Sequence, residues 1–303
     1  MNAFSIHHAD ASRPRRSTPI LHPCISPARV RRGESVAGWP AIREPGRLET
    51  VALSLLLCAL SLNLTAAAQT QAHSSLPVVP IASAQHPYEY IMLCGGPSLH
   101  LWEKYKQEPH DNYWGCFVRA ARTRIQQLEP QLKDNPAVTI TVLIYLDGYR
   151  TRSVQEHREL IPLIYSVRDT YKLNLVPFQD GEDVVRYLNY GKPRGQIKIA
   201  DFEYFGHSNQ DAFMFDYSNQ VGSCSKSWLH QNQLAQIHRG IFAPGAYVKS
   251  WGCYTGESMS QKFRAATGTS MIGAVGRVDY SNRDEALNGI EPVLSSAGGR
   301  WTR

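Results

Sequence analysis

The chain has 303 residues, of which 43% are hydrophobic, and a formal net charge of +6. A chain of this length and apolar content can bury a full core, and its composition gives no sign of disorder through most of it. Residues 1–50 carry eight Arg and four acidic residues, so they account for +4 of the net charge. Because the remainder is nearly neutral, nothing supports a nucleic-acid-binding surface, and we predict no nucleic-acid partner.

An apolar run over residues 51–64 has the form of a secretory signal. Arginines precede it, and Ala66-Ala67-Ala68 follows as a cleavage site, as in signal peptides. At 14 residues the run is shorter than the ~20 that span a bilayer comfortably, so we expect no stable membrane span after cleavage. We expect a mature chain that begins at Gln69 and is exported, to a periplasm or to the outside of the cell.

The signal divides the chain into four expected parts. These are a leader over 1–47, a signal peptide over 48–68, a linker or tail over 69–85, and one α/β domain over 86–303. The leader is either disordered or the product of a wrongly assigned start, with translation beginning nearer Val36 or Val51.

Strand-like and helix-like segments alternate from residue 86 onward. Expected strands lie at 88–94, 137–146, 173–178, 196–205, 246–251 and 270–275, with a hairpin arm at 212–216. Expected helices lie at 112–132, 153–171, 182–188, 228–237 and 258–266, and Pro162 should kink or divide the second of them. The alternation predicts an α/β fold, a three-layer sandwich with a mainly parallel central sheet. The β-branched run 137–146 is expected to be a central strand that ends in a turn at Asp147-Gly148.

A strand, a cysteine, a turn and a helix follow one another around Cys253. The apolar run 246–251 stops at Gly252-Cys253, and the helix-like segment begins at Ser258. A side chain at the carboxyl end of such a strand faces the crevice where ligands bind, and the positive end of a helix favours a thiolate. Cys253 is therefore a candidate nucleophile; the alternative is a buried small hydrophobe, as most free cysteines are.

A second strand-like run, 196–205, ends at Gly206-His207-Ser208. If the two strands are neighbours, their ends supply a general base, His207, and a nucleophile, Cys253. A histidine taken alone is more often a structural one, so the pairing of the two strand ends is what makes His207 a candidate.

Four cysteines remain in the expected mature chain, namely Cys94, Cys116, Cys224 and Cys253. Export to an oxidising compartment favours a disulfide, and a nucleophile must be left out of it. We expect Cys94 and Cys116 to pair because they are close in sequence, although three connectivities are possible. No histidine has ligand-like spacing, so no metal is predicted, and no cofactor.

The order of these parts resembles the caspase-like cysteine peptidase clan, in particular its bacterial CHAT and separase-type branch. The likeness runs from Val138 to Tyr280 and rests on the histidine strand, a hairpin, a helix, Trp-Gly-Cys253-Tyr-Thr-Gly256 and a further strand. Two positions depart from the family pattern. Gly252 stands where Ala is common, and Ser208 stands where Gly usually follows the histidine.

The resemblance implies a caspase-like domain whose Cys253 is the nucleophile and whose His207 is the base, acting on a peptide or protein substrate. It also implies an oxyanion hole formed by the backbone N–H groups of Ser208 and Cys253, in which each donor lowers the barrier by about 3 kcal/mol. The loop that holds Asp279 lines the substrate pocket in that branch, so Asp279 would select Arg or Lys before the cut. Its other reading is a cap on the turn before Ser281.

Two alternatives remain open. Ser208 in place of glycine favours a non-catalytic binding module of the same fold, with Trp228, Trp251, Phe213 and Phe215 as candidates for its surface. Gly206-His207-Ser208 also begins like the nucleophile elbow of serine hydrolases, although Gln210 stands where that motif has its last Gly.

Overall fold

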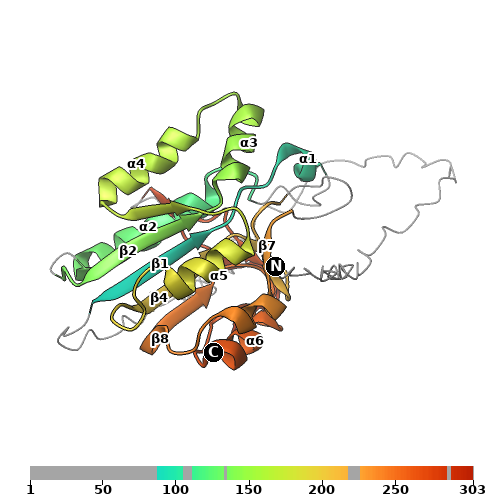
Figure 1. Cartoon of the computed structure of the whole chain (residues 1–303). Coiled ribbons are helices and arrows are strands. Elements are labelled where there is room, and N and C mark those ends of the chain that lie inside the picture. Colours follow the sequence, from blue (N-terminus) through green and yellow to red (C-terminus); the bar gives the residue numbers. More distant parts are fainter. Residues whose placement is uncertain (1–86, 105–110, 133–134, 218–225, 285–287, 303) are drawn as a thin grey trace, which may run out of the picture. The chain divides into compact units, whose positions relative to one another are not determined.

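The computed structural model describes residues 87–104, 111–132, 135–217, 226–284 and 288–302 (Figure 1). The expected leader, signal peptide and linker, and Cys224, lie outside these residues. Among the described residues, no helix is long and apolar enough to cross a membrane.

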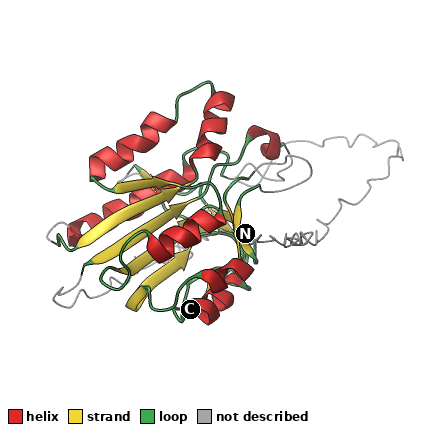
Figure 2. Ribbon diagram, in the orientation of Figure 1, coloured by secondary structure: helices red, strands yellow, loops and turns green. Residues whose placement is uncertain are grey.

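A five-stranded parallel sheet forms the centre of the domain (Figures 1 and 2). Its strands, in spatial order, are β3 (Asn174–Pro177), β2 (Val138–Ile144), β1 (Tyr88–Cys94), β4 (Lys198–Phe205) and β8 (Phe242–Ser250). All four neighbouring pairs are parallel. The prediction of a mainly parallel α/β domain is confirmed.

Helices cover the sheet on both faces. They are α2 (Cys116–Leu132), α3 (Leu146–Glu156), α4 (Ile161–Tyr171), α5 (Gly181–Tyr190) and α6 (Met259–Thr267). The short α1 (His100–Glu103) contributes no buried residue. Along β1, Tyr90 and Met92 belong to one apolar cluster with α2, α3 and α4, while Ile91 and Leu93 belong to a second with α5 and α6. Because successive strand residues point to opposite faces, the two clusters lie on opposite sides of the sheet.

The smaller strands lie outside the central sheet. They are β5 (His207–Ser208), β6 (Ala212–Met214), β7 (Trp228–His230), β9 (Ala274–Val275), β10 (Val278–Asp279), β11 (Arg283–Asp284), β12 (Gly289–Ile290), β13 (Val293–Leu294) and β14 (Arg300–Trp301). Strands β5, β6 and β7 form an antiparallel sheet, so the expected hairpin arm is present.

Several expected elements differ from the structure. Strand β2 is interior, as expected, because it pairs with β1 on one side and with β3 on the other, but the expected turn after it is not found. Asp147 and Gly148 lie in the first turn of α3, not in a turn between elements. The expected helix 228–237 is strand β7 followed by a 3-10 helix over Gln231–Gln236, because Leu229 pairs with Phe213 of the hairpin.

The long helix expected over 153–171 is divided, as Pro162 predicted. Helix α3 ends at a left-handed residue, His157, and Pro162 lies in the first turn of α4, where a missing N–H costs nothing. The strand expected over 270–275 is reduced to the pair Ala274–Val275, together with a parallel bridge between Ile272 and Lys249.

Candidate functional site

Three neighbouring strands of the sheet end at the same edge with chemically active residues. Ser98 follows β1, His207 follows β4 and Cys253 follows β8. The chain passes from β1 to β2 on one side of it, and later to β4 on its other side. The carboxyl end of β1 is therefore a topological switch point, which is where open α/β sheets bind ligands.

The His207 ring has a partner at each nitrogen. Its Nε2 lies 2.9 Å from Ser98 Oγ, and its Nδ1 lies 3.5 Å from Asp111 Oδ2. An Nδ1–H directed at the Asp111 carboxylate leaves Nε2 as the acceptor for the Ser98 hydroxyl proton. This acid, imidazole and hydroxyl arrangement is that of a serine-type triad.

Aromatic side chains hold the same ring in place. Tyr217 stacks on it with centroids 4.0 Å apart, and Phe117 of α2 meets it edge-on at 4.8 Å. Only 7% of His207 is exposed. The orientation of the imidazole is thus fixed by packing as well as by the Ser98 hydrogen bond and the Asp111 contact, as a base that must transfer a proton requires.

No local sequence pattern indicated the roles of Ser98 and Asp111. Gly95-Gly96-Pro97 indicated only that β1 ends there, and Asp111 lies in a loop before α2. Both residues approach His207 from more than ninety positions away in the chain. Only the folded chain brings them together.

Cys253 is partly exposed, and its sulfur contacts Val278. The Val278 N–H donates to Sγ at 3.3 Å, and Sγ lies 3.6 Å from the Val278 carbonyl oxygen. Burial raises the pKa of the Cys253 thiol, and the charge of Asp111 adds to this, whereas the Val278 N–H and Arg277 act to lower it. Since the burial effect is the largest, Cys253 rests as a neutral thiol and needs a base.

The ends of β4 and β8 are joined by Ser208. Its hydroxyl donates to the Cys253 carbonyl oxygen at 2.8 Å. A Cβ placed on Gly252 would lie 2.1 Å from Ser208 Oγ. The two departures from the resembled family are therefore coupled, because the Ser208 side chain fills the space that an alanine at position 252 would need.

One of the two backbone donors expected in the oxyanion hole points away from the neighbouring strand. Asn209 N–H donates to Ala212 O, and hydrogen-bonded pairs alternate along an antiparallel ladder. The next pair, Ser208 with Phe213, is therefore a non-hydrogen-bonded one, which turns the Ser208 N–H away from β6. The Cys253 N–H acts on its own sulfur, where it helps to lower the pKa of the thiol.

Asp279 lies in β10 and is half buried. Its carboxylate accepts the Ser281 N–H at 2.8 Å and the Ser281 hydroxyl at 2.6 Å, which is the turn cap expected as its other reading. Its neighbour Arg277 donates to the Tyr254 hydroxyl at 3.0 Å.

The disulfide expected between Cys94 and Cys116 is absent, and that expectation is corrected. Both are free thiols buried in the same apolar cluster. Cys94 is fully buried, and burial raises its pKa far above the usual range. Both thiols behave as small core hydrophobes.

The aromatic residues proposed for a binding surface are mostly core residues. Phe213 and Phe215 are fully buried against Tyr204, and Trp251 is 6% exposed, whereas Trp228 is 45% exposed. They do not form an exposed patch.

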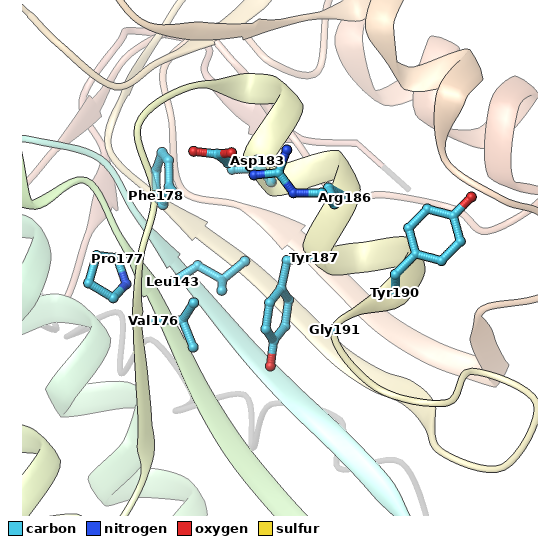
Figure 3. Close-up of a pocket in the computed structure, with 10 residues that line it drawn as sticks. Leu143, Val176, Pro177, Phe178, Asp183, Arg186, Tyr187, Tyr190 and Gly191 are labelled. Carbon is cyan, nitrogen blue, oxygen red and sulfur yellow. Dashed lines mark hydrogen bonds and ion pairs between the residues drawn. The ribbon is translucent and has the colours of Figure 1, made fainter.

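A separate pocket lies between β3 and α5 (Figure 3). Val176, Pro177 and Phe178 line one side, and Tyr187 and the Asp183–Arg186 ion pair the other. It contains none of the residues around His207 and Cys253.

No family model, curated protein or solved structure matches the chain. What the fold and site define is an α/β protein with a buried imidazole between a carboxylate and a hydroxyl, and a cysteine at the end of a nearby strand. Within the described residues, no cluster of three potential metal ligands is found.

Proposed function

We propose that the chain is an exported cysteine hydrolase, most simply a peptidase of the caspase-like type. Cys253 is the nucleophile, His207 the base, and the Ser208 and Cys253 N–H groups form the oxyanion hole. The carrying observation is the Ser208 Oγ to Cys253 O hydrogen bond, since it joins the end of the histidine strand to the cysteine.

In this mechanism His207 Nε2 takes the thiol proton and the sulfur attacks the substrate carbonyl carbon. The two N–H donors hold the oxyanion, and His207 returns the proton to the leaving amine. Water then hydrolyses the acyl-enzyme by the same route. In the resting structure Ser98 holds Nε2, so this hydrogen bond has to open before Cys253 is deprotonated.

A second candidate is a serine hydrolase that uses Ser98. It is favoured by the 2.9 Å contact of Ser98 Oγ with Nε2 and by Asp111 at Nδ1, which together are the proton path of a serine triad. The serine candidate Ser208 has less support, because its hydroxyl donates to Cys253 O.

Active-site labelling separates these candidates. A chloromethyl ketone thiol probe and a fluorophosphonate serine probe are applied to the folded chain, and the modified residue is found by peptide mapping. We expect the thiol probe to modify Cys253, with labelling lost in Cys253→Ala and reduced in His207→Ala. If the fluorophosphonate modifies Ser98, then Ser98 and not Cys253 is the nucleophile. If neither residue is labelled, the hydrolase proposal is wrong.

For specificity we propose cleavage after Arg or Lys, directed by Asp279. The Ser281 N–H and hydroxyl occupy two of the acceptor positions on the Asp279 carboxylate. A carboxylate offers about four such positions, so a guanidinium can still bind. Asp279→Ala should reduce cleavage of Arg peptides by tenfold or more, about 1.4 kcal/mol, while Cys253 labelling by a small thiol reagent persists. Normal cleavage of Arg peptides by this variant contradicts the assignment.

A further inference from the structure

A pocket on the α2 side of the domain is lined by three arginines. It has a volume of about 320 Å³ and lies between α2, α4 and the residue before β12. Arg119 and Arg122 come from α2, and Arg158 comes from the loop that joins α3 to α4. Trp114 and Leu163 are among the apolar residues of its wall.

Among the described residues, no carboxylate balances the positive charge of this arginine pocket. No carboxylate lines it, and among the described residues none of the three guanidinium groups forms an ion pair with Asp or Glu. The buried Arg152, by contrast, pairs with Glu103 and Glu156. Three uncompensated guanidinium groups around one cavity attract an anion.

Contacts with Asn288 use only part of the available donors. Arg119 Nη2 donates to Asn288 O at 2.7 Å and to its Oδ1 at 2.6 Å, and Arg122 Nη2 also donates to Asn288 O. A guanidinium carries five N–H donors, so other donors of both groups are available to a ligand. The Nε of Arg122 is buried and has no acceptor among the described residues, which costs free energy unless a ligand supplies an oxygen.

Aromatic faces orient two of the groups. Arg158 lies over the Trp114 ring at 5.9 Å, and Arg119 lies over the Tyr113 ring at 5.6 Å. The Arg158 side chain makes no hydrogen bond with a described residue and is exposed, so it is free to close on a ligand. Planar guanidinium groups held in this way suit the two oxygens of a carboxylate or phosphate.

We propose that the arginine pocket binds a small ligand through an oxyanion group, a phosphate or a carboxylate, with an apolar part of the ligand packed against Leu163 and Trp114. The proposal goes beyond the hydrolase proposal and does not depend on it.

Titration calorimetry of the full chain at low salt tests this, with inorganic phosphate, phenyl phosphate and benzoate as the probes. At least one anion should bind with a Kd below about 1 mM, and the phenyl compound should bind more tightly than inorganic phosphate. The tighter binder of phenyl phosphate and benzoate shows whether the pocket prefers a phosphate or a carboxylate. If no probe binds below about 1 mM, the proposal is overturned.

Arg158→Gln is the informative variant, because it removes a donor without breaking a hydrogen bond to any described residue. It should weaken binding about tenfold and leave the melting temperature of the unliganded protein unchanged. Arg122→Gln should weaken binding as well, but it also disturbs Asn288. The matched control is Arg168→Gln on α4, which removes the same charge from a side chain paired with Asp169 outside the pocket. Equal weakening by Arg158→Gln and Arg168→Gln, or none by Arg158→Gln, contradicts the site.

Discussion

At the scale of single residues, Ser208 and Gly252 decide how closely the ends of β4 and β8 approach. The Ser208 hydroxyl bonds the Cys253 carbonyl and takes the space beside Gly252. Caspase-like peptidases, which the sequence resembles, usually have a glycine at the position of Ser208 and an alanine at that of Gly252. In that arrangement the alanine side chain, from the end of β8, would fill the space that the Ser208 side chain fills here.

We expect Gly252→Ala alone to destabilise the fold and to abolish Cys253 labelling, because its Cβ collides with Ser208 Oγ. Overpacking of this kind costs about 1–3 kcal/mol. The double variant Ser208→Gly with Gly252→Ala should recover most of the lost stability, measured by urea unfolding. Additive losses in the double variant would show that the two positions are not coupled.

We expect Asp111 to set the tautomer of His207, since its carboxylate lies 3.5 Å from Nδ1. Asp111→Asn should reduce kcat at least about a hundredfold and have little effect on KM. Without the carboxylate the ring proton can move from Nδ1 to Nε2, and a protonated Nε2 cannot accept the proton of the nucleophile. Nitrogen NMR of the ring reports the tautomer without any substrate. An unchanged Nδ1–H signal in the variant would exclude a positioning role for Asp111.

At the scale of elements, buried charges fasten α2 to the sheet. Arg124 of α2 pairs with Asp201 and Glu203 of β4, and Trp251 Nε1 donates to Glu203 at 2.6 Å. Burial raises the pKa of Asp201 well above its usual range, the nearby Glu203 raises it further, and Arg124 opposes both.

Arg124→Met should therefore destabilise the domain by about 3–5 kcal/mol, since it leaves the acidic side chains buried without their partner. Arg124→Met with Glu203→Gln should be less destabilised than the single variant. Chemical unfolding of both variants measures this, and a single variant within about 0.5 kcal/mol of the native protein would contradict it.

At the scale of the whole molecule, the stability should depend on pH through Lys249 of β8. Its Nζ lies 3.2 Å from the Trp251 ring centroid and 4.1 Å from that of Trp301, and burial lowers its pKa to about 7. Between pH 7 and the ordinary value of 10.5, the unfolded chain binds a proton that the folded chain does not. Stability should then rise with pH across this window. The free-energy cost of burying the protonated Lys249 side chain is complete below pH 7 and disappears above 10.5.

Lys249→Met should flatten that dependence between pH 7 and 9. The difference in slope from the native protein should approach about 1.4 kcal/mol per pH unit, measured by urea unfolding at several pH values. Parallel profiles for the two proteins would mean that the tryptophan faces keep Lys249 charged, as cation–π contacts can.

The sequence alone determined the strands that carry the site and the parallel sheet they form. Apolar runs such as 196–205 and 246–251 stop at glycine, and each is flanked by helical periodicity, so local patterns were enough to place His207 and Cys253 at strand ends. The sequence also showed that Ser208 and Gly252 depart from the caspase-like pattern. It did not show that the Ser208 side chain occupies the space beside Gly252, because that contact is between two strands.

Only the tertiary structure decided which groups meet His207, and that the Cys94 and Cys116 thiols are core residues. Ser98 and Asp111 reach the imidazole from loops whose positions follow from the order of the strands, and no local pattern encodes that order. Tertiary pairing likewise made a strand of Trp228–His230, where helical periodicity had suggested a helix. Local propensity is worth a few tenths of a kcal/mol per residue, and a partner strand or a buried hydrogen bond outweighs it.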